Sequence, residues 1–164
     1  RMRGIVNHGM YQRYYHEEVG VNSRLDSIQA AVLRHKLPLL DQYNKARRSA
    51  AEYYNNAFAD VEELLTPTVG ADSTHVFHQY TLRVTNGKRN ELQAFLTEKE
   101  IPAMIYYPVP LRKQKAYDNG NYNDADFTNT DLLIDQVISL PMHTELSEEQ
   151  LQYITKNVRA FFGK

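Results

Sequence analysis

The 164-residue sequence contains no cysteine, which excludes disulfide frameworks, thiolate nucleophiles and zinc sites built on cysteine. It also has no apolar run of about 18 residues or more, and its first residues lack the basic, apolar and small-residue order of a signal peptide. We therefore expect no membrane span and take the cytoplasm as the default location. With 42% hydrophobic and 24% charged residues, the composition is that of a folded globular chain rather than a disordered or fibrous one.

Motifs of several enzyme classes are also missing. The seven glycines form neither G-x-G-x-x-G nor G-x-x-x-x-G-K-[ST], the loops that cradle nucleotide phosphates, and there is no G-x-S-x-G nucleophile elbow. Six histidines occur without ligand spacing; His75 and His78 are three apart, and on a strand such residues point to opposite faces. The sequence therefore predicts no self-contained nucleotide fold, no hydrolase and no metal site.

The net charge of −1 hides an asymmetry along the chain. Residues 1–50 carry nine Lys and Arg against four Asp and Glu, whereas residues 116–155 carry eight Asp and Glu and no Lys or Arg. The basic part is suited to an anionic phosphate, although a solvated helix face has the same bias. Because the isoelectric point is near 6.7 and the basic residues form no single stripe, we expect no nucleic acid partner.

A helical pattern runs from residue 23 to about residue 59. Apolar residues recur there at helical spacing, at Leu25, Ile28, Val32, Leu39, Tyr43, Ala46, Ala50, Tyr53 and Ala57. Pro38 lies within the run and disfavours helical geometry at the residue before it. Asn22 or Ser23 is suited to the N-cap position. We therefore expect two tandem helices or one long kinked helix.

Beyond residue 63, strand and helix patterns alternate. We expect strands at residues 76–84, 101–106 and 138–140, and helices around residues 92–96, 127–137 and from residue 147. The last helix is the best specified, because Ser147 and Gln150 have the spacing of a capping box. The irregular segment 107–122 is too long for a simple connection, as is typical of functional loops. The pattern predicts an α+β domain of two layers that follows a helical arm.

Two short segments are candidate binding sites. Residues 22–24, Asn-Ser-Arg, precede the first helical run, where free main-chain N–H groups and the positive end of the helix dipole favour a phosphate. A plain N-cap beside a solvent-exposed arginine has the same pattern. In the second segment, residues 106–111, prolines stiffen the loop; we expect one of Tyr106 and Tyr107 to face the core and the other to be available for binding. A purely structural role is the alternative for this segment.

These segments together resemble one known family. Residues 20–31 read G-V-N-S-R-L-D-S-I-Q-A-A, which resembles the G-x-N-x-R-x-x-x-I-Q-A-A signature of DegT/StrS-type sugar aminotransferases that depend on pyridoxal phosphate (PLP). Later features of the family recur in order, at His75–Tyr80, Ile105–Leu111, Gln114–Tyr117 and Ser139–His143. The resemblance covers essentially the whole chain from about residue 7.

The resemblance implies the C-terminal portion of a type I aminotransferase fold, which is of the α/β class overall. This portion is expected to be α+β, with a helical arm and a small mixed or antiparallel sheet on which helices pack. Residues 1–22 would be a partly flexible lead-in from a missing large domain, residues 23–62 a long kinked helical arm, and residues 63–164 a small α+β C-terminal domain. The full-length protein would be a homodimer with active sites built from both subunits.

The resemblance further implies amination of nucleotide-linked keto-sugars in amino-sugar, polysaccharide or cell-envelope biosynthesis, with glutamate as the donor. Asn22 would contact the phosphate of PLP in the partner subunit, and Arg24, Tyr106 and Tyr107 would contact substrate. Tyr106 replaces a histidine found in many relatives. Arg112 also stands where relatives often have histidine, which leaves its role open.

The resemblance assigns no catalytic residue to this chain. The lysine that forms the Schiff base with PLP would precede Arg1 in the large domain, so we expect the isolated chain to be inactive. Two alternatives remain: a sugar dehydratase or deoxygenase of the same fold, and a noncatalytic dimerisation module built on residues 23–59.

Overall fold

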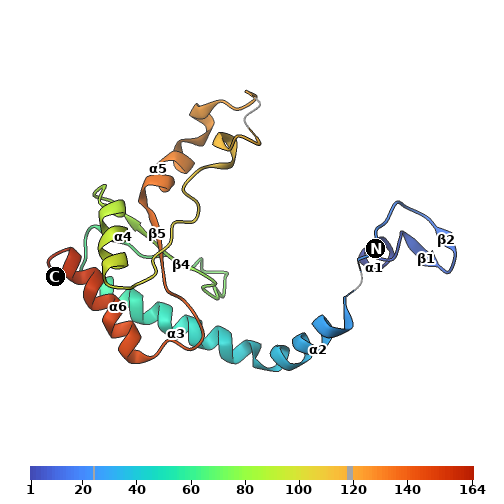
Figure 1. Ribbon diagram of the computed structural model, residues 1–164, viewed down its shortest axis with the longest axis horizontal. Helices are drawn as coiled ribbons and strands as arrows, with labels where there is room; N and C mark the ends of the chain where they lie inside the picture. The colour runs from blue at the N-terminus through green and yellow to red at the C-terminus, as the bar shows by residue number, and fades with distance from the viewer. Residues whose placement is uncertain (24, 118–119) are drawn as a thin grey trace. The chain divides into compact units, whose positions relative to one another are not determined.

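The computed structural model describes residues 1–23, 25–117 and 120–164 (Figure 1). Arg24, predicted to bind substrate, lies outside the described residues. The chain divides into two compact units, Arg1–Asp41 and Gln42–Lys164. Within the described ranges, no helix is both long enough and apolar enough to cross a membrane.

The first unit begins with a small hydrogen-bonded structure. Helix α1 (Met2–Ile5) leads into β1 (Met10–Gln12), which pairs antiparallel with β2 (Tyr15–His16). The chain then returns past its own start, and Asn22 forms an antiparallel bridge with Asn7. This close return requires glycine at residue 9, because a Cβ there would lie 1.7 Å from the carbonyl oxygen of Glu18 and the φ of Gly9 is +72°.

The predicted helical run forms successive helical elements. Helix α2 (Ser27–Lys36) continues through a 3₁₀ turn, η1 (Leu37–Leu39), into α3 (Leu40–Phe58), and Pro38 lies in the turn. The predicted N-cap at Asn22 or Ser23 is wrong, since Asp26 caps α2 by accepting a hydrogen bond from Ile28 N at 2.8 Å. Residues 22 and 23 cannot act as the N-cap, because their backbones are extended and pair with α1 and the residues after it.

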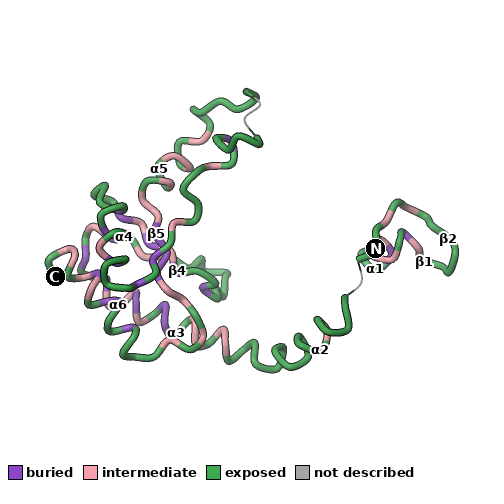
Figure 2. Tube along the Cα trace, viewed as in Figure 1, coloured by how far each residue is buried: buried purple, intermediate pink, exposed green. Residues whose placement is uncertain are grey.

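The second unit has a three-stranded antiparallel sheet in the order β3 (Leu64–Leu65), β4 (Tyr80–Val84), β5 (Val137–Leu140). Side chains of β4 alternate, with Tyr80, Leu82 and Val84 buried. Helices α3, α4 (Arg89–Glu98) and α6 (Glu148–Phe161) share this core with the sheet. Figure 2 shows the buried residues concentrated where these helices meet β4 and β5. The predicted α+β class is confirmed.

Two predicted strands differ from the structure. Strand β4 starts at residue 80 rather than 76, because Phe77 has a φ of +49° and the carbonyls of Phe77 and His78 accept hydrogen bonds from Arg47 instead of a neighbouring strand. The strand expected at residues 101–106 is wrong. Only Met104 bridges to Ser139, since the N–H of Ile101 bonds back to α4 and proline follows it.

The remaining elements follow the predictions closely. The capping box is confirmed: Ser147 Oγ accepts from Gln150 N at 3.2 Å and Gln150 Oε1 accepts from Ser147 N at 3.0 Å. The predicted helix around 127–137 is α5 (Thr128–Gln136). The long segment before it contains two 3₁₀ turns, η2 (Leu111–Lys113) and η3 (Asp124–Phe127).

Candidate functional site

Asn22 lies in extended chain rather than at a helix start. The N–H of Val21 donates to the Ile5 carbonyl at 2.8 Å and the N–H of Ser23 donates to the Val6 carbonyl at 2.9 Å, so the backbone around Asn22 is held by residues of the same unit. The side chain of Asn22 is exposed. The expectation that Asn22 lies at the start of a helix is wrong, because α2 begins five residues later, at residue 27.

Tyr106 and Tyr107 both line a cavity of about 450 Å³. We call this the apolar cavity; its other lining residues are Val109, Pro110, Leu111, Gln114, Thr130, Leu133, Ile134 and Val137. The two rings meet edge to face with centroids 5.8 Å apart. The expectation that one tyrosine faces the core is wrong, since 39% of Tyr106 and 74% of Tyr107 are exposed. Both side chains are therefore partly exposed rather than packed into the core.

Tyr106 also lines a second, smaller cavity of about 260 Å³, which we call the polar cavity. Its lining residues are Arg47, His78, Gln79, Pro102, Met104, Tyr106, Ser139, Leu140, Pro141 and Met142. Sequence reasoning assigned no role to Arg47, because an arginine on a helical arm has no local signal of a site. His78 and Gln79 belong to a segment that resembles the family, but they too were given no role. Tyr106 therefore lines both cavities.

Arg112, whose role the sequence left open, organises the long loop. Only 4% of its side chain is exposed, and it forms ion pairs with Asp131 at 2.5 Å and Asp124 at 2.8 Å. Hydrogen bonds to Asp131 and then Asp124 raise the pKa of Arg112, and Arg112 in turn lowers the pKa of Asp131. Its guanidinium also lies 4.8 Å from the centre of the Phe127 ring. Arg112 therefore ties η2 to η3 and α5, beside the loop that carries the tyrosine pair.

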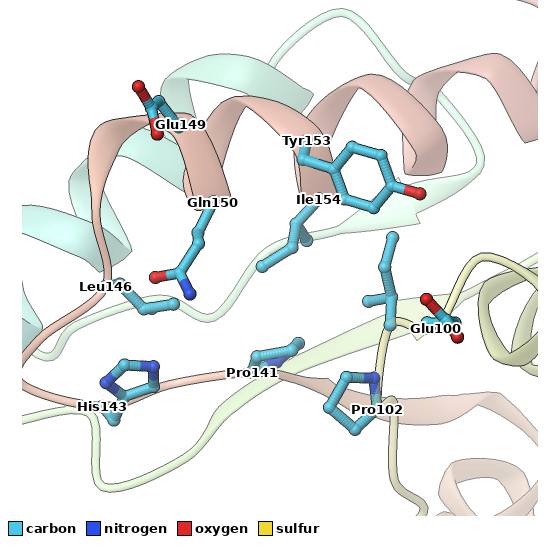
Figure 3. Close-up of a pocket in the computed structure, with 10 residues that line it drawn as sticks. Glu100, Pro102, Pro141, His143, Leu146, Glu149, Gln150, Tyr153 and Ile154 are labelled. Atoms are coloured by element: carbon cyan, nitrogen blue, oxygen red, sulfur yellow. The ribbon is translucent and has the colours of Figure 1, made fainter.

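A third cavity, of about 440 Å³, lies beside the first half of α6 (Figure 3). Apolar residues line much of it, and Glu100, Glu149 and His143 lie around them. The Tyr153 hydroxyl there donates to the Lys99 carbonyl at 3.2 Å. Of the predicted site residues that the structure describes, Asn22, Tyr106 and Tyr107, none lines this cavity, so we do not take it as the candidate site.

The histidines do not form a metal site in the part of the chain that the structure describes, where no group of three His, Asp or Glu residues has suitable geometry. His75 and His78 precede β4, so the strand argument used for them does not apply. The Nδ1 atom of His75 instead accepts a hydrogen bond from Phe77 N at 2.9 Å, which stabilises the turn before β4.

Comparison with known proteins places this geometry in a family. A profile of the DegT/DnrJ/EryC1/StrS aminotransferase family matches residues 1–159. The chain is 40% identical to a pleiotropic regulatory protein of Geobacillus stearothermophilus, over 99% of this chain and 44% of that protein. It is 37% identical to UDP-N-acetyl-3-dehydro-alpha-D-glucosamine 3-aminotransferase of Acidithiobacillus ferrooxidans, over 97% of this chain and 42% of that protein. The chain thus spans less than half the length of these relatives.

Solved structures agree with the sequence matches. The structure of S. venezuelae DesV in complex with a ketimine intermediate superposes with a TM-score of 0.91 at 33% identity, over 100% of this chain and 44% of that one. An aminotransferase from Brucella abortus superposes with a TM-score of 0.83 at 34% identity, over 99% of this chain and 43% of that one. The family profile, the relatives and the shared fold all agree with the signature at residues 20–31, and the chain belongs to the DegT/DnrJ/EryC1/StrS aminotransferase family.

Proposed function

We propose that the full-length protein is a PLP-dependent aminotransferase that acts as a homodimer in the cytoplasm. It transfers the amino group of glutamate to the keto group of a nucleotide-linked sugar, in amino-sugar biosynthesis for polysaccharide or the cell envelope. The superposition on DesV over the whole chain carries this proposal. Relatives with UDP- and dTDP-sugar transaminase names support the substrate class.

PLP, when bound, supplies the electron sink for moving the amino group. Structures of proteins with the same fold are described as holding pyridoxamine phosphate or as the PLP form. In this chain the exposed amide of Asn22 fits one contact of such a cofactor, since its NH₂ group donates hydrogen bonds to phosphate oxygens. Because its backbone is anchored within its own unit, the side chain is available to a phosphate held by the partner subunit.

Substrate contacts are assigned to Arg24, Tyr106 and Tyr107. The hydroxyl groups of the two tyrosines that line the apolar cavity are suited to donate hydrogen bonds to sugar hydroxyls or to accept them. We assign the Schiff-base role to none of the eight lysines of this chain, and infer that the chain alone is inactive.

The test uses the full-length protein from the source gene. We expect PLP to bind with a visible absorption that disappears when glutamate is added, because the amino group passes to the cofactor and 2-oxoglutarate is released. The protein with the aminated cofactor should then aminate a nucleotide keto-sugar. A bound cofactor without that absorption, in a protein that has histidine in place of the Schiff-base lysine and removes a hydroxyl group from the sugar, would support the dehydratase alternative instead. Absence of PLP binding would support the noncatalytic dimerisation module.

Residue roles are tested by matched variants of that protein. Tyr107→Phe removes one exposed hydroxyl, and we expect the KM for the nucleotide-sugar to rise roughly 2- to 10-fold. Tyr117→Phe is the control, because Tyr117 is exposed and lines neither the apolar nor the polar cavity. Equal kinetics of the two variants would contradict the role of Tyr107. Asn22→Ala is expected to weaken PLP binding without changing the secondary structure of the protein.

A further inference from the structure

The residues that line the polar cavity have the charges expected of a site that binds an anion. Its ten lining residues, all in the described part of the unit Gln42–Lys164, include one arginine and one histidine but no Asp or Glu. Gln79, Tyr106 and Ser139 add uncharged polar groups. At about 260 Å³ it lies near the lower end of ligand pockets, which hold roughly 300–1,000 Å³. The cavity therefore suits a small anionic molecule better than a nucleotide-sugar.

Arg47 is held in place at this cavity by the main chain. Its Nη1 atom donates to the carbonyl oxygens of Phe77 at 3.3 Å, His78 at 3.1 Å and Met142 at 3.2 Å. Phe77 and His78 precede β4, and Met142 follows β5. The side chain of Arg47 therefore extends from α3 and is fixed by the main chain of two loops. An arginine fixed in this way loses little side-chain freedom when it binds a ligand.

The rest of the guanidinium remains available. Within residues 1–23, 25–117 and 120–164, all hydrogen bonds recorded for the Arg47 side chain use Nη1, and no carboxylate forms an ion pair with it. Nε and Nη2 still carry N–H donors, and the side chain is half-buried rather than sealed. A carboxylate is the common partner of such a group, because its two oxygens match the spacing of two guanidinium N–H donors.

We propose that the polar cavity binds the carboxylate of the amino donor, with Arg47 as its main partner and His78 and Tyr106 beside it. The identity of the ligand as an amino donor rests on the proposed function. Tyr106 lines the apolar cavity as well, so the donor carboxylate and the sugar would occupy neighbouring cavities that share this residue. Arg47 is then a specificity-determining residue for the donor, and the cavity is the donor subsite.

Direct binding tests the site without relying on catalysis. The 164-residue chain is titrated with glutarate, which has the two carboxylates of glutamate but no amine, while amide and side-chain NMR signals of residues 78, 79 and 106 are followed. We expect saturable shifts with glutarate and none with its neutral diamide. Arg47→Lys keeps the positive charge but loses the pair of guanidinium N–H donors, and we expect glutarate to bind roughly 10- to 100-fold more weakly. His78→Leu changes an exposed residue and is expected to weaken binding roughly 2- to 10-fold.

The matched control is Arg48→Lys. Arg48 is the next residue of α3, is exposed, and lines a different cavity with Glu52 and Asn55, so its replacement should leave glutarate binding unchanged. Unchanged binding by both Arg47→Lys and His78→Leu would overturn the proposal. So would binding of inorganic phosphate or UDP at these residues without binding of glutarate, because the cavity would then serve the phosphates of the nucleotide-sugar.

The full-length enzyme provides an independent readout. We expect Arg47→Lys to raise the KM for glutamate while the KM for the nucleotide-sugar stays the same. An equal rise in both would show a general structural role and contradict a donor subsite. If the full-length protein proves not to be an aminotransferase while glutarate still binds through Arg47, the proposed function fails and the carboxylate site stands.

Discussion

Replacing Tyr54 by phenylalanine removes one hydroxyl group from the core and leaves the ring in place. Tyr54 lies on α3 and is fully buried, and its hydroxyl donates to the carbonyl of Pro141 at 2.9 Å. Its ring stacks on Phe58 with centroids 6.0 Å apart and is tilted against Tyr80 at 4.8 Å. Since phenylalanine preserves these ring contacts, the variant isolates the hydrogen bond that joins α3 to the exit of β5.

The expected loss of stability in Tyr54→Phe depends on whether the carbonyl of Pro141 is left without a hydrogen-bond donor. A buried hydrogen bond contributes about 0.5–1.5 kcal/mol net, and a buried acceptor left unpaired costs about 1–3 kcal/mol. Because the contact with Pro141 is only partly buried, we expect Tyr54→Phe to lower the free energy of unfolding by about 1–2 kcal/mol. Tyr54→Ala also removes the ring and leaves a cavity, so its expected cost is about 3–5 kcal/mol.

Urea unfolding of the 164-residue chain measures these differences, and amide hydrogen exchange in α3 and β5 shows where stability is lost. Exchange should speed up in both elements in Tyr54→Phe, because the lost bond connects them. A Tyr54→Phe variant as stable as the unaltered chain would refute the reasoning, since the hydroxyl would then contribute nothing. A loss of unfolding free energy in Tyr54→Phe equal to that in Tyr54→Ala would also refute it, because the ring contacts would then contribute nothing to stability.

Three further predictions concern the same unit. Burial raises the pKa of Tyr54, and burial and then the neighbouring Tyr54 raise that of Tyr80, above the ordinary 10.0. The unfolded chain therefore ionises these groups first, and the free energy of unfolding should fall above pH 10 by up to about 1.4 kcal/mol per pH unit for each tyrosine. Urea unfolding at several pH values above 10 measures this slope. Leu82→Ala should cost about 2–5 kcal/mol in urea unfolding, because Leu82 is fully buried in β4. Ser147→Ala should cost about 1 kcal/mol and increase amide exchange in the first turn of α6, because it removes the capping box.

Each of these predictions has a control variant in the same unit. Tyr80→Phe should reduce the slope above pH 10, and an unchanged slope would contradict the role of its burial. Leu132→Ala changes a leucine that is 49% exposed and is expected to cost less than about 0.5 kcal/mol. Ser147→Asp keeps an N-cap acceptor and should retain most of the stability lost in Ser147→Ala.

Features with a local signal were predictable from the sequence. The capping box of α6 depends on residues three positions apart, and Pro38, which interrupts the helical pattern, lies in the 3₁₀ turn between α2 and α3. The signature at residues 20–31 identified the family, and the tyrosine pair at the apolar cavity was found through the same resemblance. In each case the information lies within a few residues, so it survives without knowledge of the packing.

Strand ends and caps were decided by distant partners. Residues 22 and 23 have good N-cap side chains, but their pairing with residues 6 and 7 makes them extended and leaves the cap to Asp26. The expected strand at 101–106 has the right residue types, but the N–H of Ile101 bonds to α4 and only Met104 reaches β5. Propensity is weaker than such hydrogen bonds, because a buried backbone group must find a partner wherever one is available.

The cavities depend entirely on tertiary structure. The contacts that fix Arg47 join it to carbonyls 31 and 95 positions away, and those that bury Arg112 reach 12 and 19 positions along the chain. Composition and periodicity describe which face of a helix is apolar, but they contain no distances between segments. The family, the helical run and the capped last helix follow from neighbouring residues. The polar cavity and the position of Arg47 in it arise only because folding brings α3, the residues before β4 and the residues after β5 together.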